Sequence, residues 1–126
     1  MKIVNPPGWK RPSGYSNGVM EGGLLFVSGQ VGWDESGAFS PDLLEQVRQA
    51  LRNVCTVVEA AGAKPERIAR LTWYVTDRKA YKARQAEIGA VYREVIGRHF
   101  PAMSVVEVSG LVEDDAQVEI EATVAM

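Results

Sequence analysis

Apolar residues recur at helical spacing in two long segments of the chain. The first is expected to begin at Ser40-Pro41, because serine can cap free backbone amides and proline suits the first helical position, and to end at Gly62. The second is expected to begin at the capping residue Asp77 and to end at Gly97. The apolar positions are Leu44, Val47, Leu51, Val54, Cys55 and Val58 in the first segment, and Tyr81, Ile88, Tyr92 and Val95 in the second. Both patterns predict helices that bury one face.

Other segments show the two-residue alternation of strands. They are residues 15–20, 24–28, 68–76, 104–109 and 117–125. Gly22-Gly23 predicts a hairpin turn between the first two, and the Pro- and Gly-rich segment before Tyr15 predicts an irregular arm. The predicted order is β-β-α-β-α-β-β, which indicates an α/β (α+β) fold with a single sheet and two helices on one face.

The second face of the predicted sheet is also apolar. Leu24 and Phe26 alternate with Leu25 and Val27, so this strand presents apolar side chains on both faces. Two amphipathic helices cover only one face of a sheet. Self-association of the uncovered face is the simplest solution, so a homo-oligomer with sites at its subunit interfaces is expected.

Composition limits the classes of function. A chain of 126 residues with 46% hydrophobic and 24% charged content predicts one globular domain over residues 1–126. The formal charge of −2 gives no field that would attract nucleic acid or an anionic membrane. No apolar stretch approaches the ~20 residues of a membrane helix, and the N-terminus has no signal-like apolar core, so a cytoplasmic protein is expected. One cysteine and one histidine exclude an internal disulfide and a Cys/His zinc site, and no metal is expected.

Glu119 and Glu121 are the main candidates for chemistry. Val118, Ile120, Ala122 and Val124 define the core side of the last strand, so both carboxylates point to the opposite face. If that face is open, they are ordinary solvated residues. If another subunit covers it, partial burial raises a carboxyl pKa toward general acid–base work. Glu107 is a weaker candidate of the same kind.

The remaining candidates have plainer interpretations. The glycine of Ser28-Gly29-Gln30 would let a ligand approach backbone amides, although spacing alone favours a strand end that needs a flexible residue. His99 is interpreted as a solvated or capping residue. Cys55 lies in an apolar stripe, which predicts a buried, unreactive thiol.

Several motifs in order along the chain resemble the reactive intermediate deaminase family, also called RidA or YjgF. They are Gly14-Tyr15-Ser16-Asn17, the segment Gly23 to Val31, Glu59-Ala60-Ala61-Gly62, Val75-Thr76-Asp77, the segment Phe100 to Val108, and Val118 to Ala122. The resemblance implies a chorismate-mutase-like fold and a homotrimer with three clefts between subunits. It also implies hydrolysis of reactive enamines and imines to ketones or keto acids and ammonia, without a cofactor.

The same resemblance assigns roles to individual residues. Tyr15 would line the cleft, Ser28 and the backbone of Gly29 would border it, and Glu119 would orient or activate the attacking water. The motif segment Met103, Ser104 and Val105 would contribute to substrate binding.

Met103 departs from the family pattern. Family members that hydrolyse 2-imino acids have an arginine there, whose planar fork grips the substrate carboxylate. Arg11 and Arg98 are candidate substitutes outside the motif, and the family's helix asparagine corresponds to either Gln85 or Gly89.

Three functions remain open on the sequence. The favoured one is an enamine or imine deaminase whose substrate is not a simple 2-imino acid. The second is a pathway-specific deaminase of the 2-aminomuconate type. The third is a non-catalytic trimer that binds a small metabolite or a partner protein, an alternative that the loss of the motif arginine favours.

Overall fold

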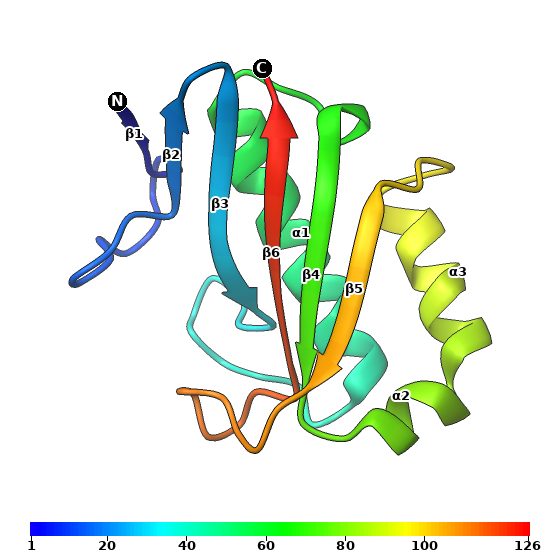
Figure 1. Cartoon of the computed structure of the whole chain (residues 1–126). Helices are drawn as coiled ribbons and strands as arrows, with labels where there is room; N and C mark the ends of the chain where they lie inside the picture. The colour runs from blue at the N-terminus through cyan, green and yellow to red at the C-terminus, as the bar shows by residue number, and fades with distance from the viewer.

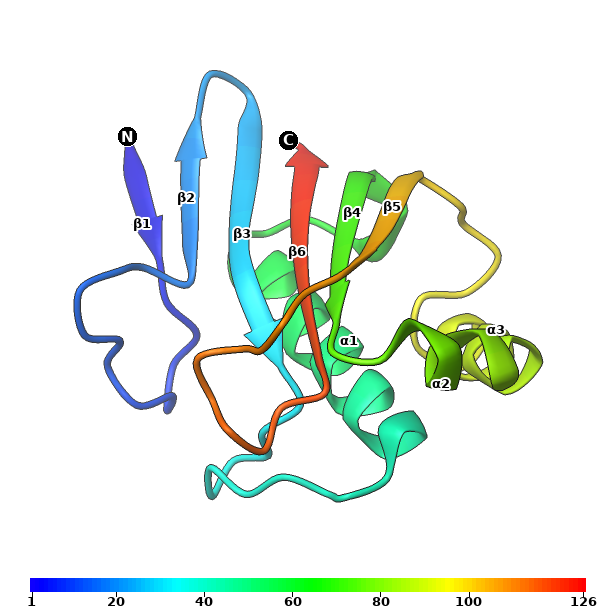
Figure 2. The same ribbon diagram turned by 60° about the horizontal axis from the view of Figure 1, so that its bottom comes forward.

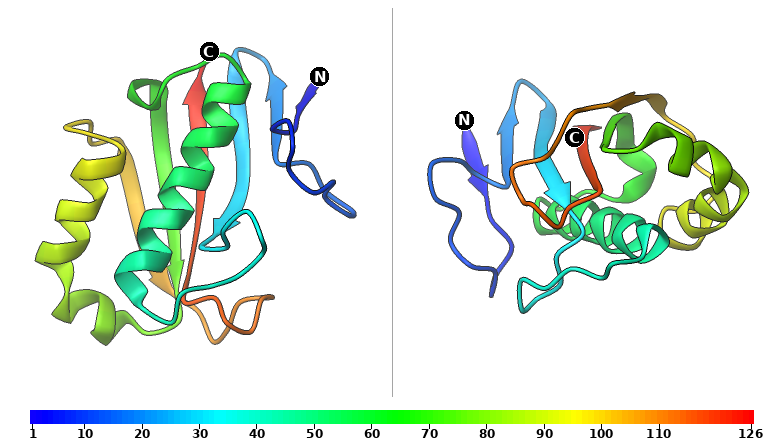
Figure 3. Two further views of the ribbon diagram at one scale, coloured as in Figure 1. Left: turned by 180° about the vertical axis from the view of Figure 1, so that it is seen from behind. Right: turned by 90° about the horizontal axis from the view of Figure 1, so that it is seen from below.

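The computed structural model describes residues 1–126, in which six strands form one sheet with the helices against one of its faces (Figures 1 and 3). The strand order is β1-β2-β3-β6-β4-β5, and only the β4–β5 pair is parallel. The strands are β1 (Lys2–Val4), β2 (Gly18–Glu21), β3 (Leu24–Val31), β4 (Ile68–Val75), β5 (Ala102–Glu107) and β6 (Val118–Ala125). The helices are α1 (Leu43–Ala60), the 3₁₀ turn η1 (Pro65–Arg67), α2 (Arg78–Ala83) and α3 (Gln85–Val95). The predicted α+β class, with helices on one face of a single sheet, is confirmed. None of the helices combines the length and the apolar composition needed to span a membrane.

The strands differ from the prediction at the N-terminal side of the sheet. The hairpin is confirmed, because Gly22 and Gly23 have φ of 60° and 79°, the left-handed region that a two-residue turn requires. The predicted strand order lacked β1, which pairs with β2 and is too short for alternation to reveal. It also ended β3 too early, since the strand continues to Val31 through a bulge between Val27 and Gln30.

The start of α1 also differs from the prediction. Asp42 is the cap, and its carboxylate accepts from the backbone N–H of Glu45, whereas the hydroxyl of Ser40 accepts from the N–H of Asp42. Long-range bonds hold the preceding residues outside the helix: the side chain of Gln46 donates to the carbonyl of Ser40, and that of Gln117 donates to the carbonyl of Pro41. The predicted helix end is confirmed, since Gly62 has a φ of 87°.

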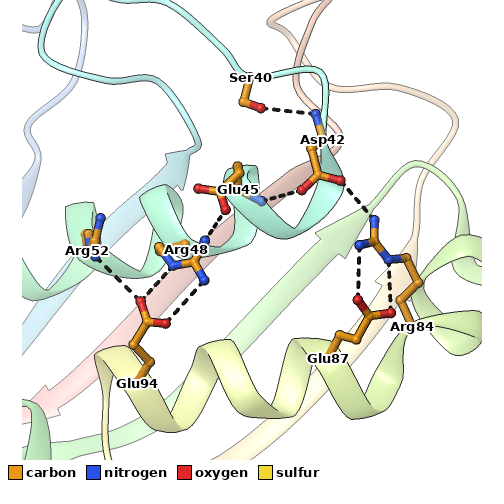
Figure 4. Close-up of polar contacts among 8 residues, drawn as sticks. All are labelled: Ser40, Asp42, Glu45, Arg48, Arg52, Arg84, Glu87 and Glu94. Carbon is orange, nitrogen blue, oxygen red and sulfur yellow. Dashed lines mark hydrogen bonds and ion pairs between the residues drawn. The ribbon is translucent and has the colours of Figure 1, made fainter.

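The second predicted helix is two helices, α2 and α3, that meet at Arg84. The backbone of Arg84 leaves the helical region, with φ of −118° and ψ of 24°. Its guanidinium donates to Asp42 at 2.9 Å and also bonds Glu87, while Arg48 of α1 binds both Glu45 and Glu94 (Figure 4). These contacts fix α3 against α1 at both ends of α3.

The core lies between the helices and one face of the sheet. The inward residues of β6 (Val118, Ile120, Ala122 and Val124) are buried as predicted, and so are Leu71, Trp73 and Val75 of β4. Cys55 is buried as well, and burial raises the pKa of its thiol to about 11, in agreement with the predicted unreactive cysteine. His99 is only partly exposed, with Nε2 2.7 Å from the carbonyl oxygen of Ile68, so it ties the segment before β5 to β4.

No helix covers the other face of the sheet. Phe26 of β3 is 46% exposed there, whereas its chain neighbours Leu25 and Val27 are buried, and Val106 of β5 is 44% exposed. An apolar face left open in the single chain is the feature from which self-association was predicted.

Candidate functional site

Two carboxylates of β6 project from the open face of the sheet. Glu119 and Glu121 alternate with buried residues, which confirms their predicted orientation. Tyr74 of β4 is the register partner of Glu119, and its hydroxyl donates to Oε1 of Glu121 at 2.6 Å. This hydrogen bond to a carboxylate raises the pKa of Tyr74. Glu121 is therefore engaged within the sheet, whereas the carboxylate of Glu119 has no hydrogen bond or ion pair with the protein.

The environment of Glu119 favours its protonated form. Partial burial raises the pKa of its carboxyl, and the negative charge of nearby Glu121 adds to the effect. A carboxyl with a raised pKa and no internal partner can take up and release a proton closer to neutral pH than an exposed glutamate can.

Gly29 brings the backbone of the β3 bulge against this carboxylate. A Cβ on Gly29 would lie 2.7 Å from Cδ of Glu119 and 2.9 Å from its Cγ, closer than real Cβ atoms approach. The backbone of Gly29 does not have a positive φ, so what it needs here is space and not a left-handed conformation. Close packing of the Glu119 side chain therefore explains the glycine, and the role of Gly29 beside a ligand stays a prediction.

Hydrogen bonds to the end of the N-terminal arm, just before β2, fix the bulge. Both the backbone N–H and the hydroxyl of Ser28 donate to the carbonyl of Asn17, at 2.9 and 3.2 Å. Asn17 is buried, and its own N–H donates to the side chain of Asn5. The side chain of buried Gln30 donates to the carbonyl of Ser28, while its own oxygen has no partner. Tyr15 lies two residues before Asn17, is 50% exposed and makes no side-chain hydrogen bond.

The motif segment on β5 divides between the two faces of the sheet. Met103 is the register partner of core residue Leu71, so it faces the helices, and Val105 packs against the core on the same side. Ser104 pairs with Thr72 and faces the open side with the glutamates. In one chain, therefore, Met103 and Glu119 lie on opposite faces.

Met103 belongs to a cleft of about 480 Å³ between β5 and the helices α2 and α3, which lie beside this edge of the sheet (Figures 2 and 3). Its wall on α3 contains both Gln85 and Gly89, the two predicted counterparts of the helix asparagine. Aromatic residues line much of the remainder: Trp73, Tyr81, Tyr92 and Phe100.

The arginine of this cleft was not predicted. Neither Arg11 nor Arg98 lines it, whereas Arg93 does. The four-residue spacing of Gln85, Gly89 and Arg93 was the available signal, because it places all three on one side of a helix. No group of three or more His, Cys, Asp or Glu side chains is arranged to hold a metal ion.

Comparison with known proteins relates this arrangement to a family. Residues 9–126 match the family model described as Endoribonuclease L-PSP. The chain belongs to this family. The chain is 39% identical over 112 residues to the 2-iminobutanoate/2-iminopropanoate deaminase of Salmonella typhimurium, an alignment that covers 86% of this chain and 84% of that protein. The resemblance to RidA/YjgF proteins is thereby confirmed.

Solved structures of the family share the whole fold. The YjgF gene product of E. coli is 33% identical with a TM-score of 0.86, and covers 99% of this chain and 98% of its own. E. coli TdcF, solved with bound serine, is 29% identical with a TM-score of 0.88, and covers 100% of this chain and 99% of its own. The family match extends over both the open face that carries Glu119 and the cleft beside α3.

Proposed function

We propose that this chain hydrolyses imines or enamines to carbonyl compounds and ammonia, with Glu119 as the general acid–base. The observation that carries the proposal is the carboxyl of Glu119, which is half-buried, unpaired, raised in pKa and seated against the bulge at Gly29. The Salmonella relative is named a 2-iminobutanoate/2-iminopropanoate deaminase, and this name supports the same chemistry.

The reaction needs a single group that both accepts and returns a proton. Protonation of an enamine at carbon, or of an imine at nitrogen, gives an iminium ion whose carbon is open to attack. Glu119 takes a proton from water as the water oxygen bonds to that carbon, and a carbinolamine forms. The proton then passes from Glu119 to the amino group, and the C–N bond breaks as ammonia leaves. The C=O bond forms as the hydroxyl proton passes to the Glu119 carboxylate, which replaces the proton consumed in the first step. A carboxyl with a raised pKa suits both transfers.

The complete site in this proposal requires a second copy of the chain. Glu119 and Ser28-Gly29 lie on the open face, whereas Met103 lies in the cleft on the helix side, so one chain does not bring them together. The exposed apolar side chains of the open face favour self-association. In a homotrimer, the open faces would pack together, which covers their apolar side chains. Each cleft would receive Glu119 from a neighbouring subunit, which completes the site.

Met103 argues for a substrate other than a small 2-imino acid. A thioether has no charge and no donor with which to grip a carboxylate. The same residue favours the non-catalytic alternative, a trimer that binds a small metabolite without reaction. The relative solved with serine bound supports that alternative.

Imine turnover separates the two candidates. Imines are generated in situ from several amino acids by an amino-acid oxidase with catalase present, and ammonia release is followed with and without the protein. The deaminase predicts release faster than the uncatalysed hydrolysis for at least one imine. The alternative predicts that ammonia is released at the uncatalysed rate from every imine and enamine tested and that a keto acid binds saturably. That result would show that the protein binds a metabolite without hydrolysing it.

A further inference from the structure

Arg93 is an unpaired cation on the wall of the α3 cleft. It makes no hydrogen bond or ion pair, whereas the neighbouring acids on α3 are engaged: Glu87 binds Arg84, and Glu94 binds Arg48 and Arg52 (Figure 4). Nη1 of Arg93 lies 3.4 Å from the position that a Cβ on Gly89 would take. The side chain therefore leans back toward the start of the helix, as long helical side chains do, and lies over Gly89.

Gly89 provides room for this arrangement. It lies inside α3 without a positive φ, where glycine destabilises a helix relative to alanine, so conformational freedom does not explain it. With no side chain at position 89, the guanidinium can lie along the wall while the cleft stays open. Apart from Gln85 and Arg93, the lining is largely apolar.

The cleft suits a ligand with a large apolar group. Its volume of about 480 Å³ lies within the range of roughly 300–1,000 Å³ that is typical of sites for drug-sized ligands. Phe100 stacks on Tyr92, with ring centroids 5.9 Å apart and planes 23° apart, and Met103 is 45% exposed beside them. Flat aromatic surfaces and a flexible thioether accommodate aromatic or branched aliphatic groups.

We propose that Arg93 is the carboxylate anchor of this protein and that its substrates are 2-imino acids, or their enamine tautomers, with large apolar or aromatic side chains. The guanidinium binds the carboxylate, and the apolar lining receives the side chain. Met103 then serves as a packing surface in place of a charged contact. This inference rests on the proposed deaminase function and names its substrate class.

The test compares Arg93→Gln with Arg98→Gln, a control at an exposed arginine outside the cleft. Imines derived from phenylalanine, leucine and alanine are the substrates. Wild type should have a higher kcat/KM for the phenylalanine and leucine imines than for the alanine imine. Arg93→Gln should raise KM for the larger imines by about tenfold or more, because a bidentate charged contact is lost. Arg93→Lys should restore part of that loss, and Arg98→Gln should match wild type.

Binding of the product phenylpyruvate, measured by titration calorimetry, separates failure of this inference from failure of the proposed function. If phenylpyruvate binding depends on Arg93 but no imine is hydrolysed, Arg93 still binds the carboxylate and the proposed deaminase function is refuted. If Arg93→Gln hydrolyses imines with the same KM as wild type, the deaminase function stands and the proposal that Arg93 binds the carboxylate is overturned. A preference of wild type for the alanine imine would also overturn the assigned substrate class.

Discussion

Alanine at position 29 should displace the carboxylate of Glu119 while leaving its chemistry intact. The new Cβ would lie 2.7 Å from Cδ of Glu119, and ordinary van der Waals contact begins at 3.4 Å. Oε2 of Glu119 lies closer still, so the carboxyl group must retreat by at least about 0.7 Å, unless the bulge moves instead. Hydrogen bonds from Ser28 to Asn17 hold the bulge, so the glutamate side chain is the part expected to give way.

The magnitude follows from the size of that displacement. A misplacement of about 1 Å in a reacting group can cost on the order of 10²-fold in rate, so a loss of tenfold to a hundredfold in kcat is expected. Overpacking costs roughly 1–3 kcal/mol in stability, and relief by an adjustable side chain should keep the cost near the lower end.

The assay is ammonia release from an imine that wild type hydrolyses, together with urea unfolding of each protein. Gly110→Ala is the matched control, because nothing lies within 4 Å of the Cβ that it adds and Gly110 has no positive φ. The control should keep wild-type kcat and stability. Wild-type kcat in Gly29→Ala, with the protein folded, would refute the reasoning that the position of Glu119 against the bulge limits turnover.

Three further outcomes are expected. Burial raises the pKa of Glu119, so the free energy of unfolding of the wild-type protein falls as pH rises and the buried carboxyl ionises. At pH 7, Glu119→Gln should therefore unfold at a higher urea concentration than wild type. This difference should disappear below the unfolded carboxyl pKa of about 4.3, where both side chains are neutral. Sedimentation equilibrium at micromolar concentration should show a trimer of the 13.8 kDa chain, and a species of only that mass would remove the shared site. Met103→Arg should increase turnover of the alanine-derived imine severalfold, by supplying a charged contact where the family motif has one; an unchanged rate would show that methionine does not limit turnover of small imino acids.

The sequence predicted what depends on local periodicity. Apolar alternation placed Val118 and Ile120 in the core and Glu119 on the other face, and turn glycines placed the hairpin and both helix ends, because these features need only a few neighbouring residues. The break at Arg84 has no glycine or proline to mark it. It coincides with ion pairs to Asp42 and Glu87, one of them 42 residues away, which no local pattern contains.

The site was predictable in its residue types but not in its arrangement. The family resemblance named Glu119 and Gly29, yet their contact joins residues far apart in the chain through a bulge whose register only the folded sheet defines. The sequence likewise offered Arg11 and Arg98 as substitutes for the motif arginine, and neither of them lines the cleft. The proximity of Arg93 to Met103 depends on how α3 packs beside β5, which no local pattern contains.

The central claim, that Glu119 transfers the protons of imine hydrolysis, is tested most directly by comparing Glu119→Gln with Glu121→Gln. The two residues share a strand and a face, but only Glu121 is engaged by Tyr74, through a bond that a glutamine oxygen can still accept. Loss of a general acid–base should lower kcat in Glu119→Gln by about 10²-fold or more, whereas Glu121→Gln should stay within a few-fold of wild type. Near-normal kcat in Glu119→Gln, or an equal loss in both variants, would contradict the account.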